Sequence, residues 1–114
     1  MTDCLFCRIA LGELPAQIVY QDGDVVAFRD VQPQAPVHVL VIPRLHMAGF
    51  ADAGDEHREL LGKIAQTAAR VAELEGIAET GYRCVVNSGT HAQQSVRHLH
   101  MHVLGGRQMT WPPG

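Results

Sequence analysis

The sequence lacks several features that would assign a chain to a broad class at once. No apolar run is long enough to cross a membrane, and residues 1–4 lack the basic flank and apolar stretch of a secretory signal. No repeat, linker or low-complexity tract interrupts the 114 residues, a length that suits one compact domain. We therefore expect a single domain over residues 1–114, a cytoplasmic location and no membrane partner.

Positive charge and cysteine are also scarce. The net charge of -3 provides no basic field for a polyanion, so we expect no nucleic-acid partner. A single phosphate group remains compatible with this charge, because backbone amides, helix ends and imidazoles can bind one. The three cysteines are an odd number, which a secreted disulfide framework would rarely have. Reduced thiols or metal ligands are the better interpretation.

Hydrophobic periodicity predicts alternating strands and helices. A short helix is expected from Cys4 to about Leu11, ended by Gly12, and a long one over 55–75, ended by Gly76. Strands are expected at 17–21, 25–30, 37–42, 82–87 and 98–104. This order favours an α+β fold, although the long helical connection leaves open whether the strands it joins are parallel.

Three histidines alternate with apolar residues in the last of these strands. His98, His100 and His102 recur with period two, so the three imidazoles should share one face. They could hold one catalytic zinc ion, or one of them could attack phosphorus or a carbonyl carbon. Residues 87–108 contain no carboxylate, but they offer uncharged hydrogen-bonding groups that suit a phosphate, at Asn87, Ser88, Gly89, Gln94 and Ser95.

The segment from His98 to Leu104 resembles the histidine triad motif of the histidine triad (HIT) family. Flanking segments resemble the purine nucleoside phosphoramidase branch of that family, and the similarity covers nearly the whole chain. They are Leu5–Ile9, Phe28–Asp30, Pro33–Pro36, Val41–His46, Gln94–Ser95, Gly105–Met109 and Trp111–Gly114.

The resemblance implies a fold, an assembly and a reaction. The fold would be a five-stranded antiparallel sheet with two helices. Two copies would join their sheets into one of ten strands, with the tail at 107–114 contacting the partner subunit. The enzyme would cleave the P–N or acyl-phosphate bond of purine nucleoside 5'-phosphoramidates or acyl nucleotides of the AMP or GMP type. It would do so through a covalent nucleotidyl-histidine on His100.

The same resemblance implies roles for the surrounding residues. His102 would bind phosphate oxygens, and Ser95 would hydrogen-bond to the leaving group. Substrate contacts would come from Asp30 at the ribose hydroxyls and from Asn87 and Gln94 near the phosphate. The purine would be bordered by Leu5, Phe6, Ile9, Phe28 and Val31, with Trp111 supplied by the partner subunit.

Cys4 and Cys7 form a Cys-x-x-Cys pair, which in general can be a redox motif, two buried thiols or half of a zinc site. Bacterial members that this chain resembles hold structural zinc through such a pair and two histidines. The matching residues here are His46 and His98, so His98 would be a metal ligand and the chemistry itself would require no metal.

The sequence departs from the branch at Ala92 and Gln93, where relatives tend to carry glycine. We expect this loop to change the substrate preference and to leave the reaction class intact. Cys84 and His38 lie in apolar strands and are interpreted as buried groups without a catalytic role. The alternatives are a dinucleoside polyphosphate hydrolase, a zinc hydrolase that uses all three strand histidines, and a non-enzymatic nucleotide-binding module.

Overall fold

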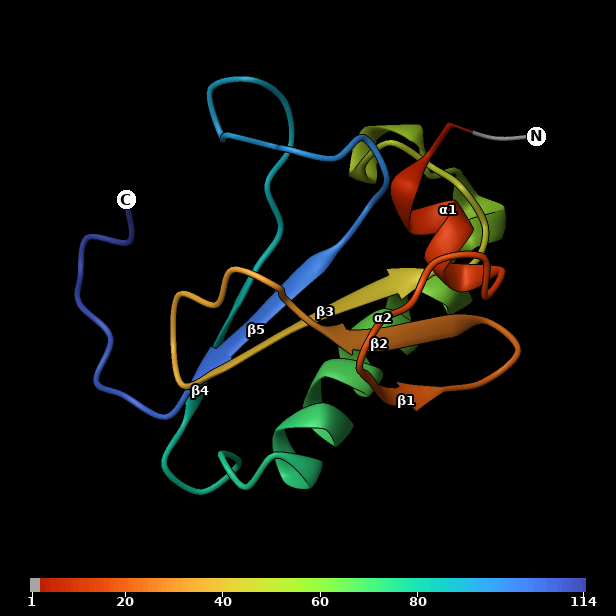
Figure 1. Ribbon diagram of the computed structural model, residues 1–114. Coiled ribbons are helices and arrows are strands. Elements are labelled where there is room, and N and C mark those ends of the chain that lie inside the picture. Colours follow the sequence, from red (N-terminus) through yellow and green to blue (C-terminus); the bar gives the residue numbers. More distant parts are fainter. Residues whose placement is uncertain (1–2) are drawn as a thin grey trace.

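The computed structural model describes residues 3–114 and shows one antiparallel sheet with helices on both faces (Figure 1). The sheet order is β1-β2-β3-β5-β4, and every pair of neighbours is antiparallel. The predicted α+β fold is therefore confirmed, and the strand direction that the periodicity left open is settled. In chain order the elements are α1 (Leu5–Ala10), β1 (Ile18–Gln21), β2 (Val25–Arg29), β3 (Val37–Pro43), the 3-10 turns Phe50–Asp52 and Asp55–His57, α2 (Arg58–Leu74), β4 (Tyr82–Val85) and β5 (Met101–Gly105).

The two faces of the sheet pack against different helices. Successive side chains of a strand point to opposite faces, and in β2 Val25 and Ala27 join the core beneath α2, whereas Val26 and Phe28 join the core beneath α1. α2 buries a helical stripe at Ile64, Thr67, Ala68, Val71 and Ala72. The small α1 covers only part of its face, so an uncovered area of sheet lies beside it (Figure 1).

Two glycines end the helices as their positions predict. Gly12 and Gly76 have φ of 76° and 74°, the left-handed conformation that glycine adopts without steric cost. Main-chain hydrogen bonds form at both helix ends: Gly12 N–H donates to Ile9 O, and Ile77 N–H donates to Ala72 O. Within residues 3–114, neither helix combines the length and apolarity that a membrane span requires.

Three local predictions need correction. The histidine strand begins only at Met101, because His98 and His100 lie in the irregular segment that leads into β5. The α-helical part of the long helix begins at Arg58, after a separate 3-10 turn over Asp55–His57. Cys84 is exposed and not buried, because β4 is an edge strand with no further strand beside it in the described sheet.

Candidate functional site

The three alternating histidines share one face but divide between two clusters. Leu99, between the first two histidines, and Val103, after the last one, pack into the core beneath α2, which turns the imidazoles toward the α1 side. His98 faces cysteines at the start of α1, whereas His100 and His102 line a cavity. The three rings are thus not arranged to share a single ion.

His100 is held in one tautomer by the main chain. Its Nδ1 lies 2.7 Å from the backbone oxygen of His98, and a carbonyl oxygen only accepts hydrogen bonds. Nδ1 must therefore carry the proton, and Nε2 keeps a lone pair. The ring is 3% exposed, and the edge-on ring of Phe6 lies 5.0 Å away, centroid to centroid. The result is an oriented imidazole whose Nε2 faces away from the main chain and is the nitrogen with nucleophilic character.

His102 is held in the opposite tautomer through His38. The Gln34 N–H donates to His38 Nδ1 at 3.0 Å, so His38 carries its proton on Nε2. That Nε2 lies 2.9 Å from His102 Nδ1, which therefore accepts, and the His102 proton is left on Nε2. Among residues 3–114 this buried Nε2 has no hydrogen-bond partner, so it is a donor available to a ligand oxygen.

Strand register explains why His38 reaches this site. Leu40 of β3 pairs with His102 of β5, and His38, two residues earlier, lies on the same face as its diagonal neighbour. His38 is buried, as predicted, but its contact with His102 gives it a role that the sequence interpretation missed. The only signal was a histidine in an otherwise apolar strand, which by itself indicates a core position.

Burial favours the neutral forms of His38 and His102. Burial and, to a smaller extent, nearby His100 and His38 lower the pKa of His102 to about 4, against a smaller opposing effect of Asp30. Burial likewise lowers the pKa of His38, against the attraction of Asp30, whose Oδ2 lies 3.4 Å from Nε2. The tautomers inferred for His38 and His102 therefore apply at neutral pH.

His100 and His102 lie at one end of a cavity of about 850 Å³, a volume typical of small-molecule sites. One wall is apolar and aromatic, since Phe6 and Phe28 lie edge to face with centroids 5.4 Å apart. Many of the predicted site residues line this cavity, namely Leu5, Phe6, Ile9, Phe28, Asp30, Val31, Ser95, His100 and His102. An apolar slot that ends in polar groups suits a ligand with a flat base and a phosphate.

Three predicted substrate contacts are not among the residues that line the cavity. Gln94 stabilises the loop 89–94 instead of lining the cavity. Its side-chain amide nitrogen donates to Ala48 O and Val96 O, and its side-chain oxygen accepts from Gly89 N–H. Asn87 is half-buried outside the lining. Trp111 is 80% exposed, with the guanidinium of Arg83 5.8 Å from its ring centroid.

The loop that departs from the family pattern contains a backbone irregularity. Gln93 has a φ of 61°, the only positive value at a non-glycine position in the described residues. A side chain in this left-handed region costs about 1–2 kcal/mol. Gln93 thus carries a side chain at a position where glycine would avoid this cost.

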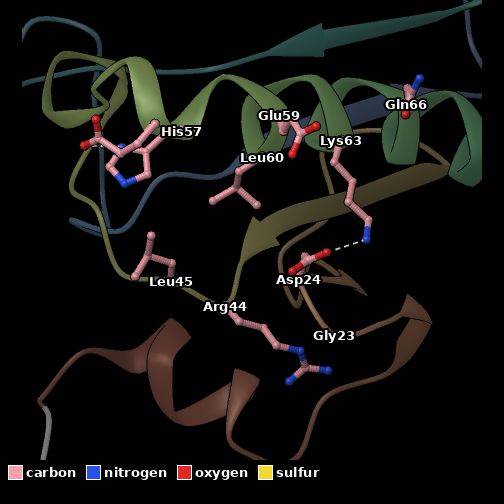
Figure 2. A pocket seen from close by; sticks show the side chains of 10 residues that line it. Gly23, Asp24, Arg44, Leu45, His57, Glu59, Leu60, Lys63 and Gln66 are labelled. Carbon is pink, nitrogen blue, oxygen red and sulfur yellow. Dashed lines mark hydrogen bonds and ion pairs between the residues drawn. The ribbon is translucent and has the colours of Figure 1, made fainter.

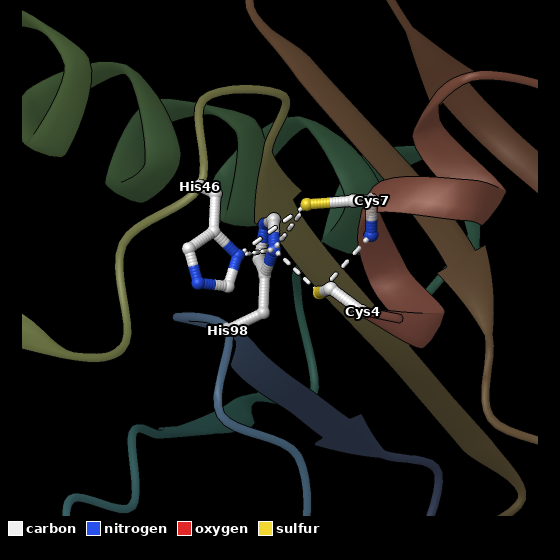
Figure 3. A group of neighbouring side chains, drawn as sticks. All are labelled: Cys4, Cys7, His46 and His98. Carbon is white, nitrogen blue, oxygen red and sulfur yellow. Dashed lines mark hydrogen bonds between the residues drawn. The ribbon is translucent and has the colours of Figure 1, made fainter. Parts of the chain in front are cut away.

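The four predicted metal ligands lie together at the start of α1 (Figure 3). The sulfur and nitrogen donors of this Cys/His cluster (Cys4, Cys7, His46 and His98) are all within 4.8 Å of one another. Cys4 Sγ and His98 Nδ1 are 3.3 Å apart, and the Nδ1 atoms of His46 and His98 are 3.1 Å apart. Tetrahedral zinc at its usual bond lengths separates its ligands by roughly 3.3–3.8 Å.

His98 also has the tautomer that a metal requires. Its Nε2 donates to the backbone oxygen of Pro43 at 2.8 Å, which leaves Nδ1 unprotonated and facing the cysteines. Burial, with His46 and His100 nearby, lowers the pKa of His98 against the opposing hydrogen bond to Pro43. Two sulfurs and two neutral nitrogens form a donor set suited to structural zinc.

A second cavity, of about 630 Å³, lies between α2, the β1–β2 turn and residues 44–45 (Figure 2). Its cations already have partners. Lys63 pairs with Asp24 at 2.6 Å, and Arg44 donates to the backbone oxygen of Asp22 at 2.7 Å. Lys63 and Arg44 are therefore not available as unpartnered cations for a ligand, in contrast to the unpartnered His102 Nε2 of the other cavity.

Comparison with known proteins agrees with this geometry. The HIT domain family model matches residues 11–109, and the chain belongs to the HIT domain family.

Three similar proteins match this chain over nearly their whole length. A purine nucleoside phosphoramidase of Escherichia coli is 48% identical over 94% of this chain and 90% of its own. A 14 kDa zinc-binding protein of Zea mays is 49% identical over 96% of this chain and 87% of its own. The crystal structure of a HIT family hydrolase from Legionella pneumophila has a TM-score of 0.96 and 52% identity, covering 98% of this chain and 100% of that one. The chain is therefore a HIT family hydrolase.

The low pKa of His102 predicts a pH-dependent stability. The unfolded chain binds this proton near pH 6.5 and the folded chain near pH 4, so the free energy of unfolding should rise with pH across this interval. The shift of about 2.5 units corresponds to ~3 kcal/mol, reduced to the order of 2 by the partial exposure of the ring. His102→Asn should make the pH dependence shallower without abolishing it, since His38 and His98 contribute in the same direction.

Urea unfolding from pH 4.5 to 7.5, with a chelator throughout, measures this dependence. The matched control is His91→Asn, a substitution of an exposed loop histidine that should leave the slope unchanged. An identical slope in His102→Asn and the parent protein would contradict the assignment.

Proposed function

We propose that this protein hydrolyses purine nucleoside 5'-phosphoramidates or acyl nucleotides through a covalent nucleotidyl-histidine at His100. The observation that carries the proposal is the bond from His100 Nδ1–H to the His98 carbonyl, which leaves Nε2 as the only nucleophilic nitrogen of that ring. His100 also lines the cavity whose apolar wall contains Phe6 and Phe28. The named activity of the E. coli relative supports the substrate class.

In the first half-reaction, His100 Nε2 attacks the α-phosphorus and the bond from phosphorus to the leaving group breaks. Negative charge on the phosphoryl oxygens is met by the His102 Nε2–H, whose direction is fixed through His38. The leaving nitrogen or oxygen takes up a proton, and the Ser95 hydroxyl at the cavity wall is the group proposed to hydrogen-bond to it.

In the second half-reaction, water attacks the same phosphorus, the P–N bond to His100 breaks, and the attacking water releases one proton to solvent, which balances the proton that the leaving group takes up from solvent in the first half-reaction. The products are the nucleoside monophosphate and the free imidazole, which recovers its lone pair at Nε2. The Nδ1–H bond to His98 O persists through both steps, so the developing positive charge of the ring stays next to a carbonyl dipole.

The remaining residues of the cavity suit the binding of a nucleoside. Phe6 and Phe28 form an apolar wall for a flat base, and Val31, which also lines the cavity, is 94% exposed. Asp30 has one carboxylate oxygen bonded to the Gln32 N–H and the other 3.4 Å from His38. As an acceptor at the cavity wall it suits the ribose hydroxyls.

A covalent adduct tests the reaction directly. Full-length protein mixed with adenosine 5'-phosphoramidate and quenched within a turnover should gain one adenylyl group, located on His100 by peptide mass spectrometry. His100→Ala should form no adduct and lose at least about 10³-fold in turnover, because the nucleophile is absent. His57→Ala, a substitution at the charged cavity, is the control and should keep the adduct. Equal turnover by His100→Ala and the parent would refute the mechanism.

We further propose that the Cys/His cluster holds one structural zinc ion, by Cys4 Sγ, Cys7 Sγ and the Nδ1 atoms of His46 and His98. Bound there, zinc supplies a cross-link between α1, the segment after β3 and the segment before β5, and it takes no part in the reaction. Support comes from the donor distances, the tautomer of His98 and the name of the Zea mays relative.

Elemental analysis of purified protein tests this assignment. We expect about one zinc ion per chain in the parent protein and near none in Cys4→Ser, because three remaining ligands bind the ion much more weakly. Cys84→Ser removes the exposed thiol of β4 and is the matched control, which should keep full zinc content. Near-zero zinc in parent and control alike would contradict the site.

We also propose a homodimer in which β4 pairs with β4 of a second copy and extends the sheet to ten strands. An uncovered edge strand presents unpaired backbone groups, and β4 lies at the edge of the described sheet. Tyr82 in β4 is exposed, and the exposed Trp111 of the tail lies beside β4, with the guanidinium of Arg83 5.8 Å from its ring centroid. The tail at 107–114 would then reach the active site of the partner.

Light scattering at micromolar concentration should report twice the 12.4 kDa chain mass, in reducing buffer so that Cys84 cannot cross-link copies. Removing residues 111–114 should preserve this mass and change the relative kcat/KM for two phosphoramidates that differ in their leaving amine. A monomer mass at these concentrations would contradict the assembly, and an unchanged kcat/KM ratio would contradict the role of the tail.

A further inference from the structure

Two direct contacts connect the Cys/His cluster to His100. The ring of His98 belongs to the cluster, with its Nδ1 3.3 Å from Cys4 Sγ, while its backbone oxygen accepts the His100 Nδ1–H at 2.7 Å. Phe6, which lies between the two cysteines in α1, places its ring 5.0 Å from that of His100 at an interplanar angle of 83°. His98 and Phe6 therefore each connect the two cysteines with His100 directly, and a change at the sulfurs can alter the position of His100 through either of them.

The position of α1 depends on few contacts. It has only six residues, too few for a helix to be stable by itself in water. Cys4 caps its first turn, with Sγ accepting the Cys7 N–H at 3.3 Å, and Arg44 donates to the Ala10 carbonyl near its last turn. Phe6 and Ala10 are its buried side chains. The two cysteines thus control the end of α1 that carries Phe6.

The cluster is open to small reagents on one side. Cys4 and Cys7 are half-buried and His46 is exposed, whereas His98 is fully buried. The two sulfurs lie within 4.8 Å of each other on the first turn of α1. Cysteines with Cys-x-x-Cys spacing at a helix start can close a disulfide with little backbone movement.

We propose that Cys4 and Cys7 are a reversible oxidation site through which a hydroperoxide switches off the nucleotidyl transfer at His100. One thiolate attacks the peroxide, takes an oxygen as sulfenic acid and releases an alcohol or water. The second thiolate attacks that sulfur, the S–S bond forms, and hydroxide leaves as water after taking up a proton. Two sulfurs lose two electrons in total, and the O–O bond gains them.

This inference rests on the proposed function of His100 as nucleophile, and the proposed zinc ion is one of the connections that oxidation would break. A disulfide sulfur carries no negative charge and is a poor zinc ligand, so oxidation should release the ion. His98 then loses the partners of its Nδ1, and α1 loses its connection to His46 and His98. We expect Phe6 and the His98 carbonyl to hold His100 less firmly, and a misplaced nucleophile reacts slowly.

The test uses zinc-loaded, full-length Cys84→Ser protein, in which Cys4 and Cys7 are the only thiols. One equivalent of hydrogen peroxide should release the zinc, detected with a colorimetric chelator. It should also lower the intact mass by about 2 Da and join Cys4 to Cys7 in the peptide map. Amide exchange of residues 5–10 should become faster, and single-turnover formation of the adenylyl adduct should slow by at least about tenfold. Dithiothreitol with added zinc should restore all of these values.

Cys7→Ser in the same background is the matched control, because it cannot form the disulfide. Peroxide should leave its adduct rate unchanged, whatever its starting value. Direct damage to the active site would instead slow both proteins alike, and that result would overturn the switch. The switch would also be overturned if fully oxidised, zinc-free protein formed the adduct as fast as the protein with reduced cysteines.

Failure of the proposed function has a different signature. If the reduced protein holds no zinc but the disulfide still slows the adduct, the zinc assignment fails and the switch stands. If the protein with reduced cysteines forms no adduct, the proposed function fails, and the amide exchange of residues 5–10 tests the switch by itself. Amide exchange that becomes faster on oxidation and returns to its starting rate with dithiothreitol supports a switch at α1, and unchanged amide exchange overturns it.

Discussion

The bond from His100 Nδ1–H to the backbone oxygen of His98 is the interaction on which the rest of the site depends. It decides which nitrogen of His100 has a lone pair, and it joins the reactive ring to the residue that borders the cysteines. The His98 ring is fixed in turn by its bond to the Pro43 carbonyl. Because ring and carbonyl belong to one buried residue, the Cys/His cluster and the cavity form one mechanical unit.

The imidazoles of His38, His98 and His102 contribute to the site as neutral groups. Burial lowers the pKa values of His38, His98 and His102, so these rings act through oriented N–H groups and lone pairs and not through full charge. Fixed dipoles in a poorly solvated cavity interact strongly with charge that develops during a reaction. They also avoid tight binding of the resting phosphate, which would lower the energy of the bound substrate and raise the barrier from it.

Local patterns predicted much of this molecule, and long-range pairing accounts for what they missed. Helix ends at Gly12 and Gly76 and the alternation around His98 to His102 depend on neighbouring residues, which a sequence displays directly. The role of His38 depends on the pairing of β3 with β5, which brings residues 64 positions apart to 2.9 Å. The exposure of Cys84 depends on which strand lies at the sheet edge, and that too is a property of the assembled sheet.

Main-chain atoms fix both active-site tautomers, through the carbonyl of His98 for His100 and the amide of Gln34 for His38. Every residue type except proline offers the same amide and every residue the same carbonyl. The orientation of the reactive groups is therefore insulated from side-chain replacement in the surrounding loops. A loop such as the one that contains Gln93 can therefore change in sequence without changing which nitrogen of His100 carries the lone pair.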